Sequence, residues 1–274
     1  MASHTQTSAI KIALVGWRDA MRAITQMMSV AGPAFLFTLM AEAAYQLLQG
    51  HSLAIEVVIF SVHWIAQSLV LTPLAIAVHR YVLLDEVTKH YALNLSDQRF
   101  QRFFGVAVAI QLLWLSMGIW LILGHFAFDM PMVRGEPITP KARENIFWIF
   151  VVVFAVLVSC FVITRVILSI AILFPAVATD APGAGWRNAR DDSKEHIFRI
   201  FCAFALGFIP TLLLDEVDEL ILAPHQVGWH PAFQAISVVL QVAKLVLMVS
   251  AFASIASTFY VAYGRRLNGR APVA

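Results

Sequence analysis

Six long apolar runs are the feature of this sequence that most limits its fold. A helix needs about 20 mostly apolar residues to cross a hydrocarbon core of about 30 Å, and each run reaches that length. Only 13% of the 274 residues are charged, about half of the share in soluble domains, which excludes a water-soluble globule. The sequence therefore predicts an all-α polytopic membrane protein with six transmembrane helices. The runs cover residues 28–48, 54–78, 103–126, 146–178, 198–222 and 233–263.

The positions of the 19 basic residues predict how these helices are oriented. Fourteen lie before the first run, in the second and fourth connections, or after the last run, whereas three lie in the third connection. Basic segments stay on the cytoplasmic side, so we expect both termini in the cytoplasm. The prediction is one membrane domain over residues 9–264, between a disordered N-terminus (1–8) and a cytoplasmic tail (265–274).

The segment 9–25 has the period of an amphipathic helix. Its apolar face carries Ile10, Leu14, Trp17, Met21 and Ile24. Its opposite face carries Lys11, Arg18 and Arg22. This pattern predicts an interfacial helix on the anionic cytoplasmic leaflet; the alternative is an ordinary amphipathic helix packed on protein.

Two more cytoplasmic segments, 81–100 and 185–196, resemble this one. The second contains further candidates for contact with the lipid surface, which are Arg187, Arg190 and Lys194. The chain is therefore interpreted either as three copies of a surface helix followed by a membrane hairpin, or as a chance echo of interfacial residues.

Three ionisable residues inside the runs are candidates for an intramembrane site, because an unpaired charge there is costly. Lys244 lies near the middle of the last run, and Asp215 lies about 10 Å deep in the fifth. Glu42 in the first run lies at a similar depth and competes for Lys244. A structural ion pair is the preferred interpretation; a charged gate, a site for protons or ions, and simple snorkelling are the alternatives.

Arg165 marks an anomaly in the fourth run. Residues 146–178 would make a helix about 50 Å long, more than a straight crossing needs. Such a helix either tilts strongly or leaves the bilayer near Arg165 and continues along the cytoplasmic interface. We expect the second, with Pro175 and the segment 179–185 ending the helix.

A resemblance to a known family rests on the same region. The residues are Arg165-Val-Ile-Leu-Ser169, Pro175-Ala-Val-Ala, Asp180, Ala189 and Ser193. The pattern resembles bacterial six-helix membrane proteins grouped around the membrane domain attached to some glycerophosphodiester phosphodiesterases. The resemblance implies a six-helix module of the bacterial inner membrane. It does not imply phosphodiesterase activity, which belongs to a separate catalytic domain.

Polar and small residues inside the runs have simpler interpretations. His63 and Gln67, one turn apart, suit hydrogen bonding between helices. Gly207 and Pro210 are expected to kink or break the fifth run. The serines 250, 254 and 257 suit close helix packing. No metal, phosphate-loop or dinucleotide motif is present, so we expect no cofactor and no metal site.

These observations favour a non-enzymatic inner-membrane protein that organises lipid or protein partners through its basic cytoplasmic surface. Anionic lipid is the expected partner, with a membrane protein or a second copy of the chain as further candidates, and nucleic acid is not expected. The alternative is a small transporter or channel with a charged site around Lys244. An intramembrane enzyme would need an adjacent nucleophile and base, which the sequence does not place.

Overall fold

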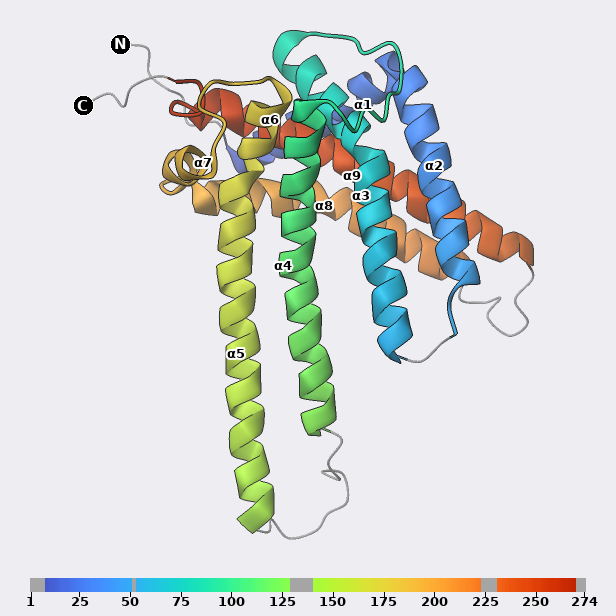
Figure 1. Cartoon of the computed structure of the whole chain (residues 1–274), viewed down its shortest axis with the longest axis vertical. Coiled ribbons are helices and arrows are strands. Elements are labelled where there is room, and N and C mark those ends of the chain that lie inside the picture. Colours follow the sequence, from blue (N-terminus) through green and yellow to red (C-terminus); the bar gives the residue numbers. More distant parts are fainter. Residues whose placement is uncertain (1–7, 51–52, 129–139, 223–230, 270–274) are drawn as a thin grey trace. The chain divides into compact units, whose positions relative to one another are not determined.

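The computed structural model describes residues 8–50, 53–128, 140–222 and 231–269, and every regular element in these ranges is a helix (Figure 1). The all-α prediction is confirmed for this part of the chain. The helices are α1 (Ala9–Gln26), α2 (Met28–Leu47), α3 (Leu53–Leu84), α4 (Gln98–Phe128), α5 (Pro140–Ala171), α6 (Leu173–Ala178), α7 (Trp186–Ser193), α8 (Ile197–Leu222) and α9 (Pro231–Tyr263). The predictions for residues 1–7, for 270–274 and for the centre of the third connection lie outside the described residues.

Five stretches within the described residues are long and apolar enough to cross a membrane. They are Met28–Leu47, Ile55–Leu84, Val153–Ala178, Ile197–Glu216 and Ala235–Tyr263. The run predicted at residues 103–126 is helical within α4, but it is not among these five. The structure therefore supports a multi-pass membrane protein with five candidate spans.

The chain forms two compact units. One comprises residues 1–107 and 168–274, and the other comprises residues 108–167. The second unit contains the later part of α4 and most of α5. The first contains the remaining helices, and all the candidate site residues except Arg165 belong to it.

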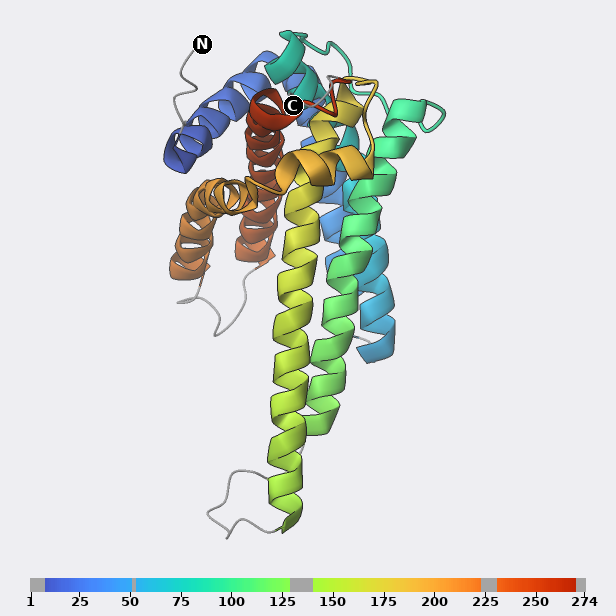
Figure 2. The same cartoon turned by 90° about the vertical axis from the view of Figure 1, so that its left-hand side faces the viewer.

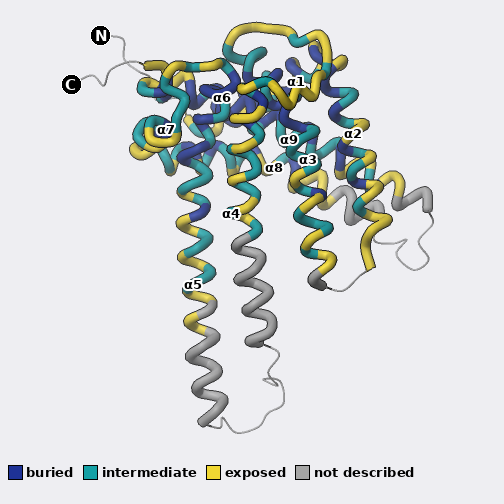
Figure 3. The backbone as a smooth tube through the Cα atoms, viewed as in Figure 1, coloured by how far each residue is buried: buried dark blue, intermediate teal, exposed yellow. Residues whose placement is uncertain are grey.

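Helix α9 is the centre of the first unit, where it packs against α1, α2, α3, α6 and α8. The views in Figures 1 and 2 show α1, α8 and α9 side by side, with α2 and α3 as a hairpin. Buried residues gather where α1, α3, α6 and α9 meet (Figure 3). Many are alanines, including Ala23, Ala34 and Ala253, because small side chains let helix backbones approach closely.

The prediction that residues 81–100 resemble a surface helix is wrong for most of that segment. Helix α3 ends at Leu84, and Asp85 adopts a left-handed backbone conformation with φ of 55°, which stops a helix. Residues 85–97 are irregular. The side chain of Asn94 then accepts from the hydroxyl of Ser96 at 2.7 Å, a local turn that competes with helix formation. The second of the three proposed units therefore lacks the surface helix that the repeat interpretation requires.

Two further expectations about helix ends need correction. Helix α5 continues through Arg165 and ends at Ala171, and the short helix α6 runs from Leu173 to Ala178; the chain then turns over residues 179–185 as expected, but the interruption at Ile172 was not predicted. Helix α8 contains Pro210 but remains helical from Ile197 to Leu222. The broken-helix alternative is therefore not seen in this part of the chain.

Candidate functional site

Helix α1 presents three different faces. At 100° per residue, the buried residues Ile12, Ala13, Gly16, Ala20 and Ala23 form one face, which packs on α8 and α9. A second face holds the apolar side chains Ile10, Leu14 and Met21, which are 60%, 66% and 47% exposed. The basic residues lie on a third face and are also exposed; they are Lys11, Arg18 and Arg22.

This arrangement changes the two-faced helix expected from the sequence. The helix does pack on protein, but through a stripe of small residues that lies between the predicted faces. Trp17 and Ile24, which were predicted on the outward apolar face, are half-buried at its border. The exposed apolar row and the basic row lie next to each other, not on opposite faces as predicted, and such neighbouring rows suit a helix in a membrane interface.

Trp17 connects α1 to α8. Its indole N–H donates to the backbone carbonyl oxygen of Gly207 at 2.9 Å. The two helices are also close to Ile255 of α9, because a Cβ at Gly16 would collide with the Ile255 side chain and a Cβ at Gly207 would lie 2.6 Å from its Cδ1. The packing of α1 on α9 therefore favours glycine at position 16, whereas Gly207 marks the close approach of α8 to α9.

Helix α7 is the second basic element. Arg187, Arg190 and Lys194 are exposed, as predicted for a surface segment. On its inner side, Asp191 pairs with Arg266, and Asp192 accepts the backbone N–H groups of Arg266 and Leu267 at 2.9 and 3.1 Å. Burial raises the pKa of the Asp192 carboxyl above its ordinary value, although the two N–H groups act against this. The acidic residues of α7 thus hold the end of α9, while the basic residues face outward.

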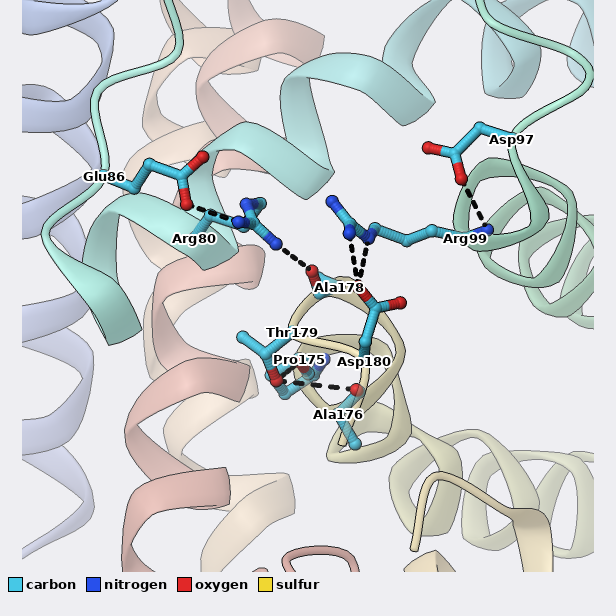
Figure 4. A network of polar contacts seen from close by, with 9 residues as sticks. All are labelled: Arg80, Glu86, Asp97, Arg99, Pro175, Ala176, Ala178, Thr179 and Asp180. Atoms are coloured by element: carbon cyan, nitrogen blue, oxygen red, sulfur yellow. Dashed lines mark hydrogen bonds and ion pairs between the residues drawn. The ribbon is translucent and has the colours of Figure 1, made fainter. Parts of the chain in front are cut away.

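A polar network joins the ends of α3, α4 and α6 (Figure 4). Arg80 pairs with Glu86 and donates to the carbonyl oxygen of Ala178 at 3.2 Å. Arg99 donates through Nε to Asp180 at 2.9 Å, and this hydrogen bond raises the pKa of the Arg99 guanidinium further. These contacts hold the end of α3 and the start of α4 against the end of α6.

Lys244 of α9 forms an ion pair with Asp215 of α8. Both residues lie in candidate spans, Lys244 in Ala235–Tyr263 and Asp215 next to the end of Ile197–Glu216. The side chains are 25% and 47% exposed. The pair joins two membrane helices, and its position suits either a structural pair or a charged site.

Glu42 does not join this pair. It is buried between α2 and α3, where His63 Nε2 lies 3.1 Å from its carboxylate and Gln67 donates at 3.2 Å. The hydrogen bond from α3 confirms that Gln67 links two helices. The sequence prediction treated Glu42 as a competitor for Lys244 and did not pair it with His63 or Gln67, because counting residues along each helix does not show which faces of α2 and α3 meet.

His79 of α3 and Ser257 of α9 form a pair that the sequence did not reveal. Nδ1 of His79 and Oγ of Ser257 are 2.8 Å apart, the geometry of a base beside a nucleophile. The two residues are only 2% and 0% exposed, so a substrate has no access to the hydroxyl. The pair therefore fits a structural hydrogen bond between crossing helices.

Arg165 is exposed in the second unit, within the candidate span Val153–Ala178.

Among the described residues, no group of three or more His, Cys, Asp or Glu side chains is placed to hold a metal ion. No protein-family model, no curated protein and no solved structure matches this chain.

Proposed function

We propose that this chain is a multi-pass protein of the bacterial inner membrane that organises anionic lipids or protein partners and catalyses no reaction. In this proposal α4 supplies a sixth span, and both termini lie in the cytoplasm with α1 and α7 on the inner leaflet. The proposal also keeps the predicted relation to the six-helix membrane-domain family.

The three faces of α1 are the observation that carries this proposal. The helix is fixed to the bundle on one side and leaves Ile10, Leu14 and Met21 exposed on another. Such a row gains free energy by entering the acyl boundary. The neighbouring basic row adds about 1 kcal/mol per residue near an anionic surface. A helix in a purely aqueous setting would have no reason to expose both rows together.

Lipid preference of the purified full chain tests the proposal. The protein is placed in nanodiscs of phosphatidylcholine, with and without phosphatidylglycerol, and thermal unfolding is measured. We expect the anionic lipid to raise the melting temperature. We also expect the triple variant Lys11→Gln, Arg18→Gln, Arg22→Gln to lose most of that increase, because its basic row is neutral.

The matched control removes the same charge from the opposite side of the predicted topology, in the variant Arg134→Gln, Lys141→Gln, Arg143→Gln. This control keeps the wild-type increase if the inner leaflet is the one recognised. A wild-type protein that neither prefers anionic lipid nor co-purifies with a membrane partner would contradict the proposal.

The Lys244–Asp215 pair favours a second candidate function, a small transporter or channel. An ion pair between two candidate spans is a functional-site hypothesis in membrane proteins. Ion flux into proteoliposomes is the test, with Lys244→Met as the comparison. Flux that is present in the wild type and lost in this variant supports transport through the pair, whereas equal flux in both removes this site.

A further inference from the structure

Glu42 is held by three N–H groups inside the α2–α3 hairpin. Besides His63 and Gln67, Gln46 on the next turn of α2 donates to its second oxygen at 3.1 Å. The side chains of Glu42 and His63 are 11% and 7% exposed. A carboxylate that accepts three hydrogen bonds is arranged as the ionised form, because each donor faces an oxygen lone pair.

The charge of this carboxylate needs a partner, because both residues lie in candidate spans. An isolated carboxylate in a low-dielectric interior costs several kcal/mol. When His63 is an imidazolium, the pair is neutral. When His63 is a neutral imidazole whose Nε2 carries the hydrogen, the same hydrogen bond remains but the site has one net negative charge. The site thus differs between its two states by a single proton.

Among the described residues, no other charged group is placed to neutralise Glu42, so the net charge of the site depends on whether His63 carries a second proton. The titratable groups nearest along the hairpin are Tyr45 on α2 and Glu56 on α3, two turns before His63. Helix α9 also packs on both helices, but the amine of its Lys244 is held by Asp215. On α1 the charges are exposed or paired on the surface: Lys11, Arg22, and Arg18 with Asp19. Helix α6 carries no titratable side chain.

Tyr45 separates this pair from a pocket. Its ring stacks on the His63 imidazole with a centroid distance of 4.4 Å. The same tyrosine lines a pocket of about 320 Å³, large enough for several water molecules. The other lining residues are Leu48, Gln49, Gly50, Glu56 and Ile59. Tyr45 is therefore a common neighbour of His63 and of this pocket.

We propose that Glu42 and His63 form a binding site for one exchangeable proton, which is supplied by water in the pocket beside Tyr45. A hydronium ion gives its proton to Nδ1 of His63 and leaves as water, and the imidazolium stays paired with the Glu42 carboxylate. Release reverses this step. This site is separate from the lipid surface of α1 and from the Lys244–Asp215 pair.

Nuclear magnetic resonance of ¹⁵N-histidine-labelled full chain in phosphatidylcholine nanodiscs tests the proposal. The His63 signal is the one that disappears in His63→Gln. In the wild type we expect it to change reversibly between imidazole and imidazolium as the pH is varied. In the near-isosteric variant Glu42→Gln we expect the midpoint to fall by about 1 pH unit or more, since a neutral amide no longer stabilises the imidazolium.

Two controls separate this effect from general disturbance. The exposed His90 should keep its midpoint in Glu42→Gln, and Glu56→Gln should move the His63 midpoint much less than Glu42→Gln does. An unchanged His63 midpoint in Glu42→Gln overturns the proposal, and so does a wild-type His63 that never gains a proton while the chain stays folded.

The proposed path of the proton from the pocket to His63 is tested separately. Ile59→Trp narrows the pocket, whereas Ile65→Trp adds the same bulk at an exposed position of α3. We expect several-fold slower hydrogen exchange at the His63 ring in Ile59→Trp and wild-type exchange in Ile65→Trp. Equal rates in both variants overturn the route through the pocket.

Discussion

Trp17 reaches from α1 to the backbone of α8, where its indole N–H donates to the carbonyl oxygen of Gly207 at 2.9 Å. Gly207 lies three residues before Pro210, which has no N–H and whose ring opens the preceding turn of the helix. In a membrane helix, carbonyl groups at such a turn need partners from elsewhere in the protein. Pro210 removes the donor of the Leu206 carbonyl, four residues earlier, and the hydrogen bond from Trp17 ties α1 to the neighbouring carbonyl of the same turn.

The same relationship occurs in α3. The hydroxyl of Tyr91, in the irregular segment after α3, donates to the carbonyl oxygen of Val70 at 2.8 Å, three residues before Pro73. Burial raises the pKa of Tyr91 to about 12, so the hydroxyl keeps its proton and remains a donor. Two segments outside the spans thus donate to carbonyl oxygens in the turns that precede the prolines of two spans.

We predict that Trp17→Phe lowers the free energy of unfolding by about 1 kcal/mol or somewhat more, because the Gly207 carbonyl loses its donor while most of the ring packing remains. Thermal unfolding in detergent measures this effect. Trp114→Phe, at an exposed position, serves as the control and should leave the melting temperature nearly unchanged. Equal effects of the two variants would contradict the assigned hydrogen bond.

Gly16→Ala should destabilise the protein by about 1–3 kcal/mol, because the new methyl group overpacks the contact with the fully buried Ile255. Gly32→Ala in α2 is the matched control, since nothing lies within 4 Å of its added Cβ. Alanine favours a helix over glycine by up to about 1 kcal/mol, so Gly32→Ala should stabilise. Chemical denaturation of both variants shows whether the signs are opposite, and the same sign for both would refute the close approach of α1 to α9.

Ser257→Ala should cost about 1–3 kcal/mol of stability, because it leaves the buried Nδ1 of His79 without its partner. Ser254 lies one turn earlier on α9 and is equally buried, but its hydroxyl has no partner among the described residues. Ser254→Ala should therefore be neutral or stabilising. Thermal unfolding compares the two variants. A fluorophosphonate probe should not label Ser257 in the folded protein, and labelling there would instead indicate an accessible nucleophile.

His196 should make the protein less stable as the pH falls. Burial, with a contribution from the charge of Arg199, lowers the pKa of His196 below its ordinary value of 6.5, and its ring stacks on Tyr263 with centroids 3.8 Å apart. The folded state then binds fewer protons than the unfolded state below pH 6.5, so stability decreases from that pH downward to the folded pKa.

The variant His196→Phe keeps an aromatic ring and removes the proton site. Its melting temperature should depend less on pH between about 6.5 and 5 than that of the wild type. The exposed His90→Gln should preserve the wild-type dependence. A profile in His196→Phe as steep as the wild type would assign the effect to another group.

The local features of the sequence predicted the helices and one of the charged pairs. The length of an apolar run can be read directly from consecutive residues. All six predicted runs lie almost wholly in helices of the structure. Lys244 and Asp215 could be matched because depth along a helix follows from counting residues at about 1.5 Å each. The partner of Glu42 could not be assigned in this way, since Lys244 and His63 were both within plausible depth.

What the sequence by itself determined is therefore the composition of a membrane protein, the approximate positions of its apolar helices and the basic character of α1 and α7. Only the tertiary structure decided which helix faces meet. The small-residue stripe of α1 lies on α9, Trp17 donates to the Gly207 carbonyl of α8, and His79 meets Ser257 across 178 positions. The physical reason is that helical period fixes the faces of each helix, whereas the pairing of those faces depends on packing between segments distant in the chain.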